Sequence, residues 1–149
     1  MRRFACSVAF VAALAGAGAA SAEPARGELE QAVRTSQAAI GRTVGDWQFT
    51  DHRGRALTAA DLRGKPWVAS FIYTGCFQVC PATTQFLRSA VKSARDALGP
   101  GRFRVVSVGF NQPFDTPEAL AAFARQQGIA DDDWIFVAPR AGDVEMILA

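Results

Sequence analysis

The chain has 149 residues, half of them hydrophobic and a fifth charged, which fits one globular domain and excludes a disordered tail or a multidomain array. Its net charge is +2, but two of its arginines lie in an N-terminal segment that we expect to be removed. The rest of the chain is neutral, so it lacks the basic surface through which proteins bind nucleic acid. A single histidine, His52, excludes a metal site built on several histidines.

Residues 1–22 have the pattern of an export signal. A cationic start precedes an apolar stretch at residues 4–15, and Ala20-Ser21-Ala22 is a small-residue cleavage site. The apolar stretch is shorter than the about 20 residues of a spanning helix. We therefore expect an exported, periplasmic product, tethered to the inner membrane only if the segment stays uncleaved. Cys6 lies inside the stretch and is interpreted as incidental.

The first elements after the signal are a short helix or arm and a hairpin. Residues 28–40 place apolar side chains at helical spacing, but the segment is short and could equally be an extended arm. Residues 47–50 and 55–58 alternate around the turn residues 51–54, which predicts a β-hairpin. His52 falls on its tip, where we expect a solvated turn residue.

Three apolar runs then alternate with helical patterns. Residues 67–73 form a nearly unbroken apolar run, typical of a strand buried on both faces of a parallel sheet. A helix is predicted from Pro81 to Leu98, followed by a second strand at residues 103–108. A helix capped by Thr116-Pro117 and a third strand at residues 134–137 complete the pattern. This alternation predicts an α/β fold with right-handed crossovers.

Cys76 and Cys80 lie between the first of these strands and its helix. A plain structural disulfide is one interpretation, but closing so short a loop gains only about 2 kcal/mol in the chain-entropy estimate. Helix N-termini point toward the carboxyl ends of parallel strands, so their amides and dipole should make both sulfurs more acidic than free cysteine. Two soft sulfurs without a nearby histidine favour Cu(I) over Zn(II), which takes four ligands.

The residues around the cysteines resemble the Sco/SenC family of thioredoxin-like copper-binding proteins. The resemblance covers roughly residues 44–137 and rests on four segments: Gly64-Lys65-Pro66, residues 70–81, Val106-Ser107-Val108 and Asp115-Thr116-Pro117-Glu118. It implies a thioredoxin-like α/β fold, with a central, mostly parallel sheet, flanking helices and a preceding β-hairpin. The expected organisation is a signal peptide at 1–22, an N-terminal arm at 23–43 and this domain at 44–149.

The family resemblance also implies a function. In the family, copper is held by the two motif cysteines, here Cys76 and Cys80, and by a distant histidine. The protein would deliver copper to the copper centre of a respiratory oxidase, or reduce that centre's cysteines during assembly of cytochrome c oxidase. Its expected partner is the oxidase subunit with that centre, or another copper carrier. The alternative is an enzyme, a periplasmic thiol–disulfide oxidoreductase that cycles the same two cysteines. Stoichiometric Cu(I) uptake would indicate the copper carrier, whereas catalytic turnover of a disulfide would indicate the oxidoreductase.

The sequence departs from the family pattern in two places. Residues 109–114 read Gly-Phe-Asn-Gln-Pro-Phe where the family more often has a shorter acidic turn. No histidine follows Cys80, so the third copper ligand is not assigned, and His52 precedes the motif and cannot be carried over. Met146 stands among apolar residues and is expected to be a core residue rather than a substitute ligand.

The last residues suggest a truncated domain. Residues 143–149 begin as a capped helix and stop after less than two turns. We therefore expect that the C-terminal hairpin and helix of the family fold are missing from this sequence. In that case one edge of strand 67–73 would be unpaired, with Val68 and Ile72 exposed, and would be a template for aggregation.

Overall fold

The computed structural model describes residues 26–148, without the side chains of Arg26, Ala141, Met146 and Leu148. The expectations about the signal segment, Cys6 and Met146 lie outside this description. The chain divides into two units, residues 1–42 and residues 43–149. The described part of the first unit contains α1 (Arg26–Gln37), so the segment that could be a helix or an arm is a helix.

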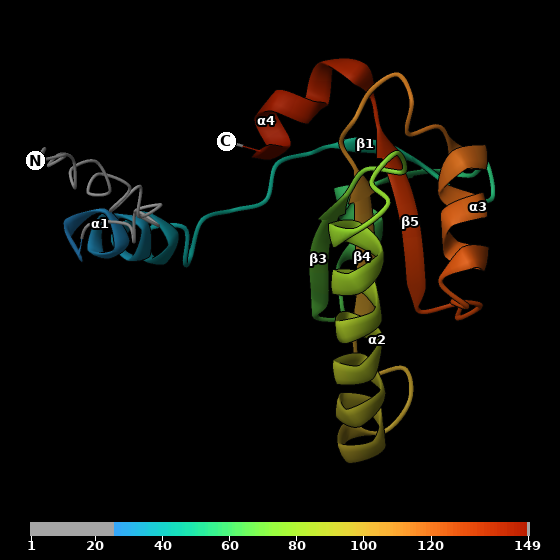
Figure 1. Ribbon diagram of the computed structural model, residues 1–149, viewed down its shortest axis with the longest axis horizontal. Helices are drawn as coiled ribbons and strands as arrows, with labels where there is room; N and C mark the ends of the chain where they lie inside the picture. Colours follow the sequence, from blue (N-terminus) through green and yellow to red (C-terminus); the bar gives the residue numbers. More distant parts are fainter. Residues whose placement is uncertain (1–25, 149) are drawn as a thin grey trace, which may run out of the picture. The chain divides into compact units, whose positions relative to one another are not determined.

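The second unit contains a five-stranded mixed sheet in the order β2-β1-β5-β4-β3 (Figure 1). Its strands are β1 (Gln48–Asp51), β2 (Ala56–Thr58), β3 (Trp67–Ile72), β4 (Arg104–Gly109) and β5 (Trp134–Pro139). β3, β4 and β5 are parallel, whereas β1 is antiparallel to both β2 and β5. The predicted α/β fold is confirmed, and the predicted hairpin joins the same sheet through β5.

The helices between the parallel strands of this unit follow the predicted order, and the two short 3₁₀ helices of this unit were not predicted. They are η1 (Ala59–Leu62), α2 (Val79–Leu98), α3 (Pro117–Gln126), η2 (Ala141–Asp143) and α4 (Val144–Leu148). The α3 cap is as predicted, because the Thr116 hydroxyl accepts a hydrogen bond of 3.3 Å from the Ala119 amide and Pro117 is the first helical residue. Among the helices of the described residues, none has the length and apolar character needed to cross a membrane.

A core lies on each face of the sheet. On one face the sheet packs against α2 and α3, which Figure 1 shows alongside the strands. The members of this core include Val91, Val105, Leu120, Phe123, Trp134 and Phe136, together with both cysteines of the motif. On the other face η1 and α4 contribute to a second core, formed by Phe49, Leu62, Val106, Val108 and Val137 with Ile147 packed against it. The cysteines are therefore part of the helical face.

β3 is more exposed than its composition predicts. Among the described residues it pairs only with β4 and lies at the edge of the sheet. Val68 and Phe71 are 40% and 45% exposed, whereas Ile72 is buried in the first core. The expected burial on both faces is therefore wrong. At the edge of the sheet, the side chains of β3 have a neighbouring strand on one side only, so they are less covered than those of a central strand. From the sequence, both Val68 and Ile72 were expected to be exposed; this is right for Val68 and wrong for Ile72.

The hairpin tip lies against β5 rather than in open solvent. The His52 amide donates to the Phe136 carbonyl at 2.8 Å, and His52 Nδ1 accepts from the Phe136 amide at 3.2 Å. The imidazole also meets the Phe136 ring edge to face, with centroids 5.7 Å apart. The prediction of a solvated turn residue is wrong, because pairing of β1 with β5 brings the tip against the sheet. Partial burial lowers the pKa of His52.

Candidate functional site: a cysteine pair at the start of a helix

Cys76 and Cys80 lie where β3 ends and α2 begins. Cys76 is in the connection, and Cys80 is the second residue of α2. Both are free thiols, and both are at most 9% exposed because they pack into the core beneath α2 and α3. The predicted position of the pair, at the carboxyl end of a parallel strand and at a helix N-terminus, is the position that they occupy.

The sulfur of Cys76 accepts a hydrogen bond from the first turn of α2. Gln78 precedes the helix and makes no side-chain cap, while the Cys80 amide donates to Cys76 Sγ at 3.2 Å. This bond is the main cause that lowers the pKa of Cys76 to about 6, and the amide of Gln78, the Cys80 thiol and the Tyr73 hydroxyl act in the same direction. At neutral pH, Cys76 is therefore the thiolate of the pair.

Cys80 has the opposite tendency. Burial raises the pKa of its thiol, and the negative charges of Cys76 and Asp115 raise it further. The expectation that both sulfurs are more acidic than free cysteine is right for Cys76 and wrong for Cys80. The reason is that the helix amide reaches one sulfur, while the second sulfur lies deeper and next to the charge that this amide stabilises. The pair is thus one thiolate beside one thiol.

A fully buried carboxylate connects the cysteine loop to the loop after β4. Asp115 Oδ1 accepts from the amide and from the hydroxyl of Thr74, each at 2.7 Å, and Asp115 Oδ2 accepts from the Asn111 amide at 2.8 Å. The sequence analysis used Asp115 only as part of a family motif and missed this role. A signal was available, since Thr116 already caps α3 and the cap does not need the aspartate directly before it.

The chain segment around the cysteines carries exposed aromatic side chains and no charge. No charged residue occurs between Tyr73 and Leu87. Phe77, between the cysteines, is 90% exposed, and Phe114, on the loop that Asp115 holds, is 69% exposed. Tyr73 packs edge to face on Phe110, with ring centroids 5.8 Å apart. The cysteine segment therefore presents an aromatic side chain and no charged one.

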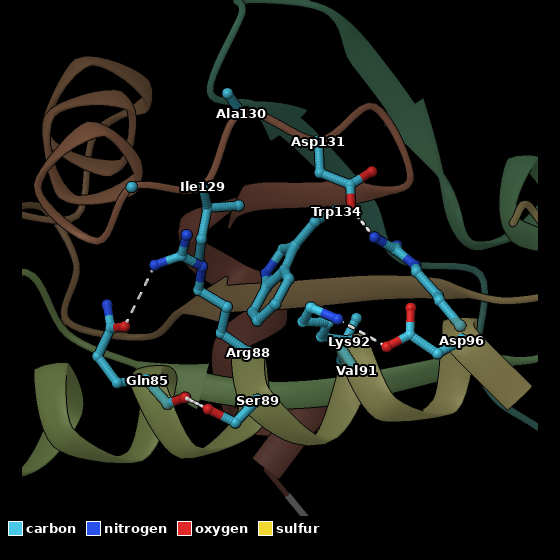
Figure 2. A pocket seen from close by; sticks show the side chains of 12 residues that line it. Gln85, Arg88, Ser89, Val91, Lys92, Asp96, Ile129, Ala130, Asp131 and Trp134 are labelled. Atoms are coloured by element: carbon cyan, nitrogen blue, oxygen red, sulfur yellow. Dashed lines mark hydrogen bonds and ion pairs between the residues drawn. The ribbon is translucent and has the colours of Figure 1, made fainter.

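One cavity beside α2 does not include the cysteines. It has a volume of about 620 Å³ and lies between α2 and the start of β5 (Figure 2). In its lining Lys92 pairs with Asp96 at 2.6 Å and Arg95 pairs with Asp131. Within the described part of the chain, Arg88 donates only to oxygens of Gln85 and Gln127. Among the residues that the structure describes, no three His, Cys, Asp or Glu side chains are grouped to hold a metal ion. The two sulfurs remain the candidate site.

Comparison with known proteins identifies the class. Residues 35–133 match the family model described as SCO1/SenC. The sheet, the helices and the cysteine pair at the β3–α2 junction define a thioredoxin-like domain, and the chain belongs to the SCO1/SenC family.

One curated relative shows the extent of the likeness. The mitochondrial SCO2 homolog of Bos taurus is 32% identical over 122 residues, which cover 77% of this chain and 45% of that protein. The chain spans less than half the length of the curated relatives that it matches.

Two solved structures share the fold. BsSco, a member of the Sco family of cytochrome c oxidase assembly proteins with a disulfide switch, has a TM-score of 0.63 at 24% identity, over 72% of this chain and 63% of that one. Copper-bound ScoI of Bradyrhizobium japonicum has a TM-score of 0.56 at 23% identity, over 72% of this chain and 65% of that one. At these identities the likeness shows the thioredoxin-like fold.

Proposed function

We propose that this protein binds copper through Cys76 and Cys80 and supplies it to the copper centre of a respiratory oxidase. The observation that carries the proposal is the pair of free thiols at the start of α2, one of them held by a helix amide at 3.2 Å. Membership of the SCO1/SenC family supports it, as does the copper-bound state of the related ScoI. Copper is here a cargo that the protein passes on.

The chemistry of the two sulfurs suits Cu(I). Cu(I) is a soft ion that prefers thiolates and accepts few ligands, whereas Cu(II) prefers nitrogen and oxygen donors in a tetragonal arrangement. Cys76 offers a thiolate already at neutral pH, and binding of the ion would release the proton of Cys80. The family's third ligand, a histidine, is not placed, because no histidine follows Cys80 in this sequence.

The partner and the compartment are part of the same proposal. BsSco is a cytochrome c oxidase assembly protein, which supports an oxidase subunit, or another copper carrier, as the partner of this chain. The uncharged cysteine segment, with its exposed aromatic side chain, suits docking of a polypeptide rather than of a nucleic acid. The export pattern at residues 1–22 supports a periplasmic location, with the inner membrane as anchor if that segment is retained.

A second candidate function rests on the unequal acidity of the pair. A thiolate beside a protonated thiol is the arrangement of a nucleophilic and a resolving cysteine in thiol–disulfide exchange. In that function Cys76 would attack a disulfide of the partner, and Cys80 would then release the reduced partner. Reduction of the cysteines of an oxidase copper centre is one form of this activity.

Competition for Cu(I) between the reduced full-length protein and a chromogenic Cu(I) chelator tests the first function. We expect uptake of one Cu(I) per chain, and loss of uptake in Cys76→Ser and in Cys80→Ser. Cys6→Ser is the matched control, since Cys6 is the third cysteine of the sequence, and it should bind like the wild type. Full uptake by the Cys76→Ser/Cys80→Ser double variant would overturn the proposal. Catalytic turnover of a disulfide substrate without Cu(I) uptake would favour the oxidoreductase.

A further inference from the structure

The buried carboxylate of Asp115 holds the loop that carries the cysteines. Of its three hydrogen bonds, two go to the amide and the hydroxyl of Thr74, which stands two residues before Cys76. The third goes to the Asn111 amide in the loop after β4. Asp115 is 0% exposed, and such a group keeps its bonds because leaving its partners unsatisfied in the interior is unfavourable. The two loops are therefore joined through one side chain.

The space between the end of β4 and Asp115 is filled. A Cβ atom on Gly109, at the end of β4, would lie 2.8 Å from the Cβ of Asp115 and 3.0 Å from Leu120 Cδ2. Contacts this short do not occur between real side chains, so glycine is required for Asp115 to enter. The backbone at the end of β4 and the carboxylate thus fit together as one unit beside the cysteine loop.

We propose that Asp115 is a positioning residue for the cysteine pair: through Thr74 it holds the segment that leads into Cys76, so that Cys76 Sγ stays on the Cys80 amide. This inference rests on the proposed function, because it assigns a residue that determines how tightly the cysteine pair binds Cu(I). Asp115 makes no hydrogen bond to either sulfur; it holds the loop through the amide and the hydroxyl of Thr74, and its charge separately raises the pKa of Cys80. In metal sites, loss of such outer partners typically weakens binding about 10- to 100-fold.

Asp115→Asn breaks the link with little change in volume. The new side-chain NH2 donates and cannot accept a hydrogen bond, so it places a second donor opposite either the Asn111 amide or the Thr74 amide. Asp51→Asn is the matched control. Asp51 is also buried and also accepts two backbone amides, those of Arg53 and Arg55, both on Oδ1, but it does so in the hairpin turn. It accepts the Arg55 guanidinium on the other oxygen.

Two measurements on the full-length chain in a Cys6→Ser background test the proposal. The first is Cu(I) affinity by chelator competition, where we expect Asp115→Asn to lose about tenfold and Asp51→Asn to stay within about twofold. The second is the equilibrium with glutathione, in which two thiols become a disulfide while oxidised glutathione becomes two reduced molecules. Here Asp115→Asn should shift the equilibrium constant at least about fivefold and Asp51→Asn should not.

Equal effects of the two substitutions on both measurements, or no effect of Asp115→Asn, would overturn the proposal. Thr74→Val and Thr74→Ser test the link without changing the charge of Asp115, and they also serve if Asp115→Asn does not fold, because serine keeps the hydroxyl that donates to Asp115 and valine does not. Thr74→Ser should match the wild type and Thr74→Val should not; identical values would overturn the inference. The glutathione equilibrium needs no copper, so it decides on Asp115 even if the wild type fails to take up Cu(I).

Discussion

The two cysteines should react with an alkylating agent at different pH values. Hydrogen bonding to the Cys80 amide lowers the pKa of Cys76 from 9.0 to about 6, whereas burial raises the pKa of Cys80. At pH 7 the thiolate fraction of Cys76 is then about nine tenths, against about one hundredth for an unperturbed thiol. The pKa of Cys76 should therefore lie below the ordinary value of 9.0 and the pKa of Cys80 above it.

The midpoint of the pH profile is a better test than the rate. A thiolate of lower pKa is a weaker nucleophile. A pKa lower by about three units reduces the intrinsic rate of the thiolate about twentyfold. The net gain of Cys76 over an ordinary thiol at pH 7 is thus only about fourfold. Iodoacetamide labelling of the reduced protein from pH 4 to pH 10, with each peptide quantified by mass spectrometry, gives both midpoints separately. We expect about 6 for Cys76 and a value above 9.0 for Cys80.

Cys80→Ala tests the cause of the shift. The variant removes the Cys80 thiol but keeps the backbone amide that donates to Cys76 Sγ. Because the amide is the main cause, the midpoint of Cys76 should stay well below its ordinary value in the variant. A return of that midpoint to the ordinary value, or labelling of Cys80 at lower pH than Cys76 in the wild type, would refute the reasoning.

Two further predictions concern stability and are checked by urea denaturation. Burial lowers the pKa of His52 from 6.5, so the unfolded chain binds a proton first as the pH falls, and stability is lost below about pH 6.5. His52→Ala should cost about 1 kcal/mol at pH 7 by removing the acceptor of the Phe136 amide, and this difference should narrow toward pH 5; parallel curves would contradict it. Gly109→Ala should destabilise by about 1–3 kcal/mol, since its Cβ would lie 2.8 Å from Asp115. Gly142→Ala, where a Cβ meets nothing within 4 Å, should stay within about 0.5 kcal/mol, and equal midpoints for the two variants would speak against overpacking.

Local patterns in the sequence were sufficient for the strands, for α2 and α3 and for the position of the cysteines. The alternation of residues 47–58 around a turn predicted the β1–β2 hairpin, and Thr116-Pro117 predicted the start of α3. The spacing of Cys76 and Cys80 before a helical pattern placed them at a helix N-terminus. These features depend on neighbours within a few residues, where backbone preference and side-chain periodicity act directly.

Only the tertiary structure decided what those residues meet. The amides and side chains that determine the environment of His52 and Thr74 come from Phe136 and Asp115, which are 84 and 41 residues away along the chain. The unequal acidity of the cysteines likewise depends on the depth to which α2 packs Cys80 into the core. Periodicity tells which side of an element is buried, but the partner of a buried polar group is set by how strands are ordered in the sheet. That order places β1 beside β5 and β3 at the edge, and it arises from long-range packing that no short segment specifies.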